Sequence, residues 1–307
     1  MTRAASAGLY RYDRSGGALA FRVANTVLLG GVALAMLYPF IYVVSVSISD
    51  LSAVATREVR LLPIGFDLDA YRRIFRSDLL LGSYWNTIHY TTVGVAVSLT
   101  LIALTAYPLS IRTFYGRRVV TLLFVVTMFF SGGFIPLFLI VRGLGFMDTV
   151  WALAVPGAIG VFHLIIARTQ FEQIPDSLRE SAKMDGAGHF RILGVLYLPL
   201  SLPMFATLFL FISVGHWNSF FAPLMYMREL TRQPLQVILR EILVRNKLTG
   251  ILGEFQSFEW RQEEYVPGMQ QALRAGAIIV STGPILLVYP FIQRYFVKGA
   301  LLGSLKE

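Results

Sequence analysis

The chain has 307 residues, of which 55% are hydrophobic and 15% are charged, with a mean hydropathy of +0.62 and a net charge of +9. Soluble domains carry about 25% charged residues, so this composition favours a membrane protein over a soluble one. The positive charge fits the Lys and Arg of cytoplasmic loops better than a nucleic-acid surface. The chain contains no cysteine, which excludes disulfides and thiol chemistry, and its histidines share no metal-ligand spacing: His89, His163, His189 and His216.

Six stretches of the chain contain no Asp, Glu, Lys or Arg and are long enough to cross a bilayer. A spanning helix needs about 20 mostly apolar residues. The first stretch is longer than the apolar core of a cleavable signal peptide. None alternates strictly, so we predict helices rather than a closed barrel, the two structures that satisfy a backbone in lipid. The stretches are 23–49, 79–111, 119–141, 149–167, 192–227 and 275–293.

The distribution of arginine predicts the orientation of the chain in the membrane. Residues 1–22 carry four arginines, and the short loop 112–118 carries three, whereas 142–148 carries one. Because short cytoplasmic loops are rich in Lys and Arg, we expect an all-α polytopic protein with both termini in the cytoplasm. The expected parts are an N-terminal tail 1–22, a membrane region 23–297 with spans at about 23–48, 84–111, 119–141, 149–168, 195–216 and 275–294, a charged cytoplasmic loop 170–192, outer loops 49–83 and 217–270, and a C-terminal tail 298–307.

Both outer loops contain a predicted amphipathic helix. In the first loop, DLDAYRRIFRS follows Pro63 and fits a surface helix. In the second, Leu235, Ile238, Leu239 and Ile242 recur at helical spacing, which predicts a helix lying on the outer face. The acidic and aromatic residues 254–265 that follow fit either an interfacial aromatic belt or a docking surface for an external partner.

Motifs for nucleotide binding and hydrolytic chemistry are absent from the sequence. There is no G-x-x-x-x-G-K-[ST] phosphate loop, no H-E-x-x-H and no G-x-S-x-G. Carriers driven by ion gradients often hold ionisable residues within their spans. Here the apolar stretches contain none except His89, His163 and His216. Active transport by this chain would therefore need an external source of energy.

The charged stretch Glu172–Pro203 carries signals for two short helices on a cytoplasmic loop. Pro175 suits a first helical turn, and Ser177–Glu180 matches the S-x-x-E capping box. Asp185–Gly186 predicts the end of the helix, because glycine adopts the left-handed conformation that ends many helices. Asp185 could then cap a second helix through residues 190–192. From spacing alone, this stretch is either a docking surface for a partner or an ordinary loop.

Three short motifs in this stretch carry a family resemblance. Glu180-Ser181-Ala182, then Asp185-Gly186-Ala187, then Leu198-Pro199 resemble the EAA signature of binding-protein-dependent ABC importer permeases, with serine in place of the middle alanine. Further segments resemble the permease subgroup for alginate and other complex oligosaccharides, so that the resemblance covers most of residues 20–304. These segments are FFSGGFIPLFLIVRGLGFMDTVWALAVPGAIGVFHLIIART (129–169), VGHWNSFFAPLMYM (214–227), PLQVILREIL (234–243) and GPILLVYPFIQRYFVKG (283–299).

The resemblance implies a type I ABC importer permease fold in a bacterial cytoplasmic (inner) membrane. It implies a second permease chain, usually different, that completes the pore, and an extracytoplasmic sugar-binding protein. Two cytoplasmic ATPase subunits would bind ATP and Mg and drive alternating access, so this chain would need no cofactor and would catalyse no reaction. The ATPase would dock on a coupling helix within residues 175–190, whose signature residues are Glu180, Ser181, Ala182, Asp185, Gly186 and Ala187.

Candidate residues for the saccharide path are polar and aromatic, because sugars are held by aromatic stacking and neutral hydrogen bonds. Two trios lie near the expected outer ends of spans, and one histidine lies inside a span. The alternative for the trios is an interfacial belt, where Trp and Tyr are enriched. The alternative for the histidine is a satisfied interior side chain. The candidates are Tyr84, Trp85, Asn86, His163, His216, Trp217 and Asn218.

Two other classes of protein remain as alternatives at the level of the residues. A gated channel or receptor could bind a cytoplasmic protein through residues 172–191, but it would work without ATP. A membrane-embedded enzyme would need reactive groups within the spans. The lack of acids, cysteine and paired histidines there argues against the enzyme.

Overall fold

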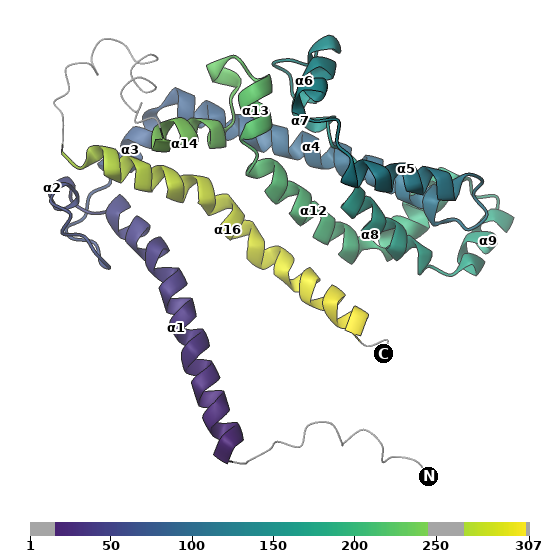
Figure 1. Cartoon of the computed structure of the whole chain (residues 1–307), viewed down its shortest axis with the longest axis horizontal. Helices are drawn as coiled ribbons and strands as arrows, with labels where there is room; N and C mark the ends of the chain where they lie inside the picture. Colours follow the sequence, from purple (N-terminus) through teal and green to yellow (C-terminus); the bar gives the residue numbers. More distant parts are fainter. Residues whose placement is uncertain (1–15, 245–266, 305–307) are drawn as a thin grey trace. The chain divides into compact units, whose positions relative to one another are not determined.

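The computed structural model describes residues 16–244 and 267–304, and every regular element in these ranges is a helix (Figure 1). Two elements depart from α geometry: η1 is a π-helix and η2 is a 3-10 helix. The elements are α1 (Gly16–Ser47), α2 (Leu51–Ala55), α3 (Asp69–Arg76), α4 (Asp78–Ser110), α5 (Arg117–Phe129), α6 (Phe134–Gly143), α7 (Trp151–Ala154), α8 (Val161–Glu172), α9 (Asp176–Met184), α10 (His189–Ile192), η1 (Leu193–Tyr197), α11 (Leu198–Leu200), α12 (Leu202–Trp217), α13 (Phe221–Tyr226), η2 (Leu230–Arg232), α14 (Leu235–Val244) and α16 (Met269–Ser304).

The chain divides into two compact units, and the first contains described residues 16–72 and 267–276. A loop after α1 is tied back to that helix by buried serines. The Ser45 hydroxyl donates to the Leu61 carbonyl at 2.8 Å, and the Ser49 hydroxyl accepts from the Ile64 amide at 3.1 Å. Since α1 exposes apolar side chains along most of its length, its sequence suits lipid or a partner helix rather than water.

The start of α2 in the first unit is fixed by an N-cap and a close backbone contact. Asp50 Oδ1 accepts from the Ser52 amide at 2.8 Å and from the Ser52 hydroxyl at 2.6 Å, and these bonds lower the pKa of the Asp50 carboxyl. Gly268 has φ +85, and a Cβ there would lie 2.2 Å from the Leu51 carbonyl oxygen. Only glycine fits at this position.

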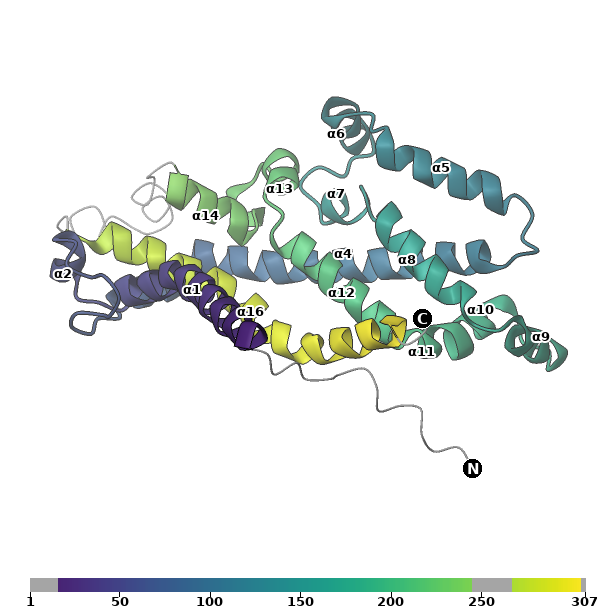
Figure 2. The ribbon, with the colours of Figure 1, turned by 60° about the horizontal axis from the view of Figure 1, so that its bottom comes forward.

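The second unit contains described residues 73–244 and 277–304 and is organised around α4. Helices α8 and α12 pack along α4, and Figures 1 and 2 show all three side by side. Small residues on α4, such as Ala106, let the neighbouring backbones approach closely. The core lies where these helices meet, and its most deeply buried members include Ile102, Leu109, Leu164, Phe171 and Leu208.

Several of the spans expected from the sequence are not single continuous helices in the structure. By length and composition, two helices in the described residues can cross a membrane, Leu19–Ser47 and Asp78–Ser110, or up to four if each bent pair is one span. The first bent pair, α5 and α6, divides the expected span 119–141 with a bend of 116°. Gly133, with φ +83, precedes α6. The second bent pair meets at Ser201 with a bend of 84°.

The remaining expectations have mixed outcomes. Both amphipathic segments are helical, as α3 and α14, but the apolar face of α14 is packed inside the protein: Leu235 and Ile242 are 3% and 1% exposed. Helix α1 begins at Gly16, inside the expected N-terminal tail. Residues 1–15, 305–307 and the aromatic segment 254–265 lie outside the described residues.

Candidate functional site

The segment with the EAA-like motif folds as two short helices, α9 and α10, joined by a tight turn. Gly186 has φ +77, in the left-handed region that glycine adopts without strain. Its amide donates to the Lys183 carbonyl at 3.0 Å, and the Ala187 amide donates to the Ala182 carbonyl at 2.9 Å. This pair of bonds is the Schellman motif, which satisfies the last carbonyls of a helix. The predicted turn at Asp185–Gly186 is therefore confirmed.

The predicted capping of these helices is wrong in two respects. Helix α9 begins at Asp176 after Pro175, and no side chain caps it, so Ser177 lies inside the helix and not at its cap. Asp185 ends α9, whereas α10 begins after Gly188. Proline at the N-cap position carries no side-chain acceptor. Ser177 is the second residue of α9, past the N-cap position that a capping box requires.

The six signature residues divide between two faces of this segment. Ala182 and Ala187 are partly buried against the core of the second unit. Glu180, Ser181, Asp185 and Gly186 are exposed. Beside them, the large side chains of Met184 and Phe190 are 88% and 82% exposed. Exposed apolar groups next to exposed acids form a surface that suits a protein partner better than water alone.

An aromatic and polar cluster ties α9 and α10 to the end of α4. The Tyr107 hydroxyl lies 3.1 Å from His189 Nδ1. The Tyr107 ring packs edge to face on Tyr197 of the π-helix, with 4.9 Å between ring centroids. Arg179 of α9 is 8% exposed in its side chain and pairs with Asp176 at 3.0 Å. These contacts pack α10 and the π-helix against the end of α4.

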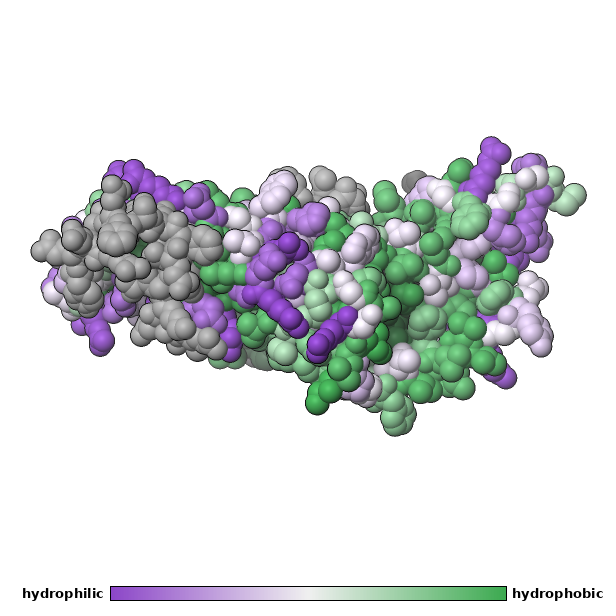
Figure 3. All heavy atoms as spheres, turned by 90° about the horizontal axis from the view of Figure 1, so that it is seen from above, coloured by the Kyte–Doolittle hydropathy of each residue, from purple (hydrophilic) through white to green (hydrophobic). Residues whose placement is uncertain are grey.

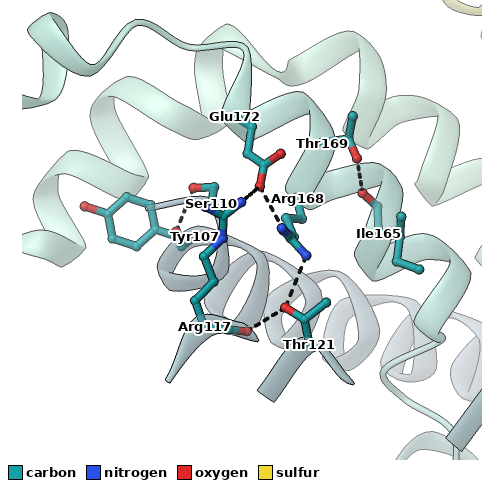
Figure 4. Close-up of polar contacts among 8 residues, drawn as sticks. All are labelled: Tyr107, Ser110, Arg117, Thr121, Ile165, Arg168, Thr169 and Glu172. Carbon is teal, nitrogen blue, oxygen red and sulfur yellow. Dashed lines mark hydrogen bonds and ion pairs between the residues drawn. The ribbon is translucent and has the colours of Figure 1, made fainter. Parts of the chain in front are cut away.

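A second polar cluster joins the start of α5 to the end of α8, just before α9 (Figure 4). Glu172 Oε1 accepts from Arg117 and, at 2.9 Å, from Arg168 Nε. Arg168 also donates to the Thr121 hydroxyl at 3.1 Å, and Thr121 donates to the Arg117 carbonyl at 2.8 Å. Arg168 and Glu172 are four residues apart on one helix, a spacing from which sequence reasoning could have found this pair. The contact of Arg117 with Glu172, 55 residues away, depends on how α5 packs against α8.

Two of the seven predicted saccharide-path residues, His163 and His216, line the same cavity. This cavity has a volume of about 310 Å³ and lies between α4, α8, α12 and α13. His216 rests on Gly94 of α4, where a Cβ would lie 2.5 Å from its Cε1 atom. Polar residues that the sequence analysis did not select also line the cavity: Thr87, Tyr90, Ser98 and Ser219.

The other five candidates do not line this cavity. The Trp217 indole is 8% exposed, packs on Tyr84 and donates to the Ser281 carbonyl at 3.1 Å. The Asn86 amide donates to the Thr231 carbonyl at 2.7 Å. Trp85 is 69% exposed, and Asn218 is exposed at the end of α12.

No group of three or more His, Cys, Asp or Glu side chains in the part of the chain that the structure describes is arranged to hold a metal ion. The described residues that line the cavity include no Asp or Glu.

Comparisons with known proteins agree with this description. The family described as "Binding-protein-dependent transport system inner membrane component" matches residues 79–301. The polygalacturonan/rhamnogalacturonan transport system permease protein YtcP of Bacillus subtilis (strain 168) is 43% identical over 275 residues, which cover 89% of this chain and 94% of YtcP. Protein LplC of the same organism is 40% identical, over 93% of this chain and 95% of LplC.

Solved structures have the same fold. A chain of a bacterial ABC transporter involved in the import of the acidic polysaccharide alginate is 37% identical, with a TM-score of 0.83 over 92% of this chain and 98% of that chain. A second chain comes from the bacterial alginate ABC transporter in complex with alginate pentasaccharide-bound periplasmic protein. It is 15% identical, with a TM-score of 0.54 over 88% of this chain and 94% of that chain. At this identity it supports the fold alone. This chain therefore belongs to the binding-protein-dependent transport system inner membrane components, and it is a non-catalytic, multi-pass permease subunit of an ABC importer.

Proposed function

We propose that the chain forms half of the pore of an importer for oligosaccharides that contain uronic acids. The observation that carries this proposal is the 43% identity, over 89% of the chain, with a permease named for polygalacturonan and rhamnogalacturonan. The 37% identical structure belongs to an importer of alginate, also an acidic polysaccharide. The saccharide would arrive from an extracytoplasmic binding protein, and a second, homologous permease would complete the pore.

The chemistry of the cavity supports an acidic substrate. The described residues that line it include no Asp or Glu, so a carboxylate on the sugar would meet no like charge from them. His163 and His216 supply hydrogen-bonding groups, and the volume of about 310 Å³ lies at the lower end of ligand pockets. We infer that the saccharide passes His163 and His216, with the remaining lining contributed by the second permease.

We infer that the chain crosses the membrane six times, with both termini in the cytoplasm. The three arginines of residues 112–118 support this orientation. In this topology α9 faces the cytoplasm, where Glu180, Ser181, Asp185 and Gly186 would contact an ATPase subunit. The exposure of these residues beside Met184 supports that assignment.

The proposal is tested by transport in proteoliposomes that contain both permeases and the ATPase, with the binding protein added outside. We expect ATP-dependent uptake of a labelled trigalacturonate, and uptake of maltotriose at least tenfold slower. Both substrates contain three sugar units, so the difference in their uptake does not come from length and reports the effect of the carboxylates. Equal uptake of the two sugars would contradict acidic selectivity, and uptake without ATP would favour the gated channel.

A further inference from the structure

A groove rich in arginine lies at the start of α5 and is separate from the histidine cavity. Its volume is about 1090 Å³, and it is formed by the loop after α4, the first turns of α5 and one side chain of α8. The lining residues are Arg112, Phe114, Tyr115, Gly116, Arg117, Arg118, Val119, Thr121, Leu122, Val125 and Arg168.

The groove carries an excess of positive charge. Arg117 and Arg168 share the single carboxylate of Glu172. Arg112 and Arg118 are exposed and form no ion pair with any residue that the structure describes. The four guanidinium groups and the carboxylate of Glu172, which lies behind the lining, give a net charge of +3, and the described lining residues include no Asp or Glu. The ligand that complements this charge is an anion.

Two of the guanidinium groups are held in place before any ligand binds. The side chains of Arg117 and Arg168 are 24% and 22% exposed, and their bonds to Glu172 fix their orientation (Figure 4). Arg168 is held a second time by the Thr121 hydroxyl at 3.1 Å. Guanidinium groups match the geometry of phosphate oxygens, and groups already held in place lose less freedom on binding.

The groove continues into an apolar stripe along α5. Val119, Leu122 and Val125 recur every three residues on the same side of the helix, and Val119 and Leu122 are 62% and 60% exposed. Tyr115, which is 99% exposed, stands beside the arginines, as aromatic residues do at a membrane interface. Figure 3 shows a largely hydrophobic surface where Figure 1 places α5, with hydrophilic side chains gathered toward the α9 end.

We propose that this groove binds the headgroup of an anionic phospholipid, with one acyl chain along Val119, Leu122 and Val125. A soluble polyanion or an acidic protein would use the arginines alone, whereas a phospholipid joins a phosphodiester to a hydrocarbon chain. The inference rests on the proposed topology, which puts residues 112–118 at a membrane surface. Basic pockets of this kind on the cytoplasmic side of membrane proteins suit anionic headgroups.

The test measures binding of dioctanoyl phosphatidylglycerol to the purified importer complex in a neutral detergent. Arg112→Gln with Arg118→Gln removes two charges without breaking a bond to any described residue. We expect binding to weaken about 30-fold, because each arginine near an anionic lipid contributes a factor of about five. Arg112→Lys with Arg118→Lys should keep most of the affinity. The matched control, Arg60→Gln with Arg142→Gln, removes the same charge outside the groove and should bind like the natural chain.

Each alternative predicts a different result. Equal binding of dioctanoyl phosphatidylcholine, or equal weakening in the control pair, would overturn the proposal. Glycerol 1-phosphate that binds as tightly as the lipid would show that the acyl chain is not held. If Arg112→Gln with Arg118→Gln lost the ATPase during purification but bound the lipid with unchanged affinity, the groove would be assigned to a protein partner. The complex could bind the lipid as expected and yet import no acidic saccharide. That result would contradict the proposed substrate but not the proposed lipid site.

Discussion

At the scale of single residues, neighbours decide whether a polar or aromatic side chain is free to bind a ligand. Asn86 and Trp217 both donate hydrogen bonds to backbone carbonyls of other elements, those of Thr231 and Ser281. These contacts give both residues a packing role, and their place in the saccharide path stays a prediction. His216 lines a cavity and Glu180 is exposed on the surface, so both side chains are accessible to a ligand or a partner.

Reversing the charge of Glu180 tests the proposed ATPase surface. We expect Glu180→Lys to lower the amount of ATPase recovered with the permease at least about tenfold, because loss of a charge partner in an interface costs 2 kcal/mol or more. The measurement is the ratio of ATPase to permease after purification of the complex. Glu58→Lys is the matched control, since Glu58 is also exposed and lies in an expected outer loop. Normal recovery of the ATPase with Glu180→Lys would refute the assignment.

Adding one methyl group to Gly94 tests the cavity. In Gly94→Ala the new Cβ would lie 2.5 Å from the His216 ring, so the ring must move. We expect a loss of stability of about 1–3 kcal/mol, as for other overpacked sites, and slower saccharide uptake. Gly82→Ala on the same helix adds the same group with no atom within 4 Å. Thermal unfolding and uptake of both variants are compared; identical behaviour would mean that the His216 position is unimportant.

At the scale of elements, the turn between α9 and α10 and the π-helix after α10 set the geometry of the segment that we propose contacts the ATPase. The Schellman motif ends α9 after nine residues, and the π-helix Leu193–Tyr197 brings Tyr197 onto Tyr107 and Phe171. Single π-turns in α-helical proteins are frequent at functional sites. Here the π-helix lies between the proposed ATPase surface and α12, the helix that carries His216.

The turn itself can be tested with two neighbouring glycines. Gly186→Ala forces alanine to φ +77, which costs about 1–2 kcal/mol. We expect the turn to open and ATP hydrolysis by the assembled complex to respond less to the loaded binding protein. Gly188 has φ −72, and a Cβ there meets no atom within 4 Å, so Gly188→Ala should behave like the natural chain. Equal stimulation of ATP hydrolysis in both variants would remove the turn from the coupling mechanism.

At the scale of the whole molecule, bends interrupt several of the helices that could cross the membrane. Among the described residues, two helices are long and apolar enough to cross the membrane. In two further candidate spans, the two helices of a pair meet at bends of 116° and 84°. Breaks in spanning helices are tolerated where neighbouring helices or a cavity satisfy the freed backbone groups. The second break, at Ser201, precedes the helix that contributes His216 to the cavity.

The absence of natural cysteine allows the orientation to be measured without a background signal. We expect Leu62→Cys to react with a membrane-impermeant maleimide in intact cells, and Tyr115→Cys to react only after the membrane is opened. Both side chains are exposed, Leu62 at 74% and Tyr115 at 99%, so accessibility within the protein does not limit the reaction. The reverse labelling pattern would invert the proposed topology.

The sequence by itself determined the class of protein, the apolar stretches and the EAA-like motif with its turn at Gly186. These features are local: run length, arginine in short loops, and glycine where a helix must turn. The tertiary structure decided which side chains meet. It brought Arg117 to Glu172 and Tyr107 to His189 across more than fifty residues of sequence, and it broke the expected span 119–141 at residues 130–133. Spacing within one helix predicts a shared face, but contacts between helices depend on packing that no local pattern encodes.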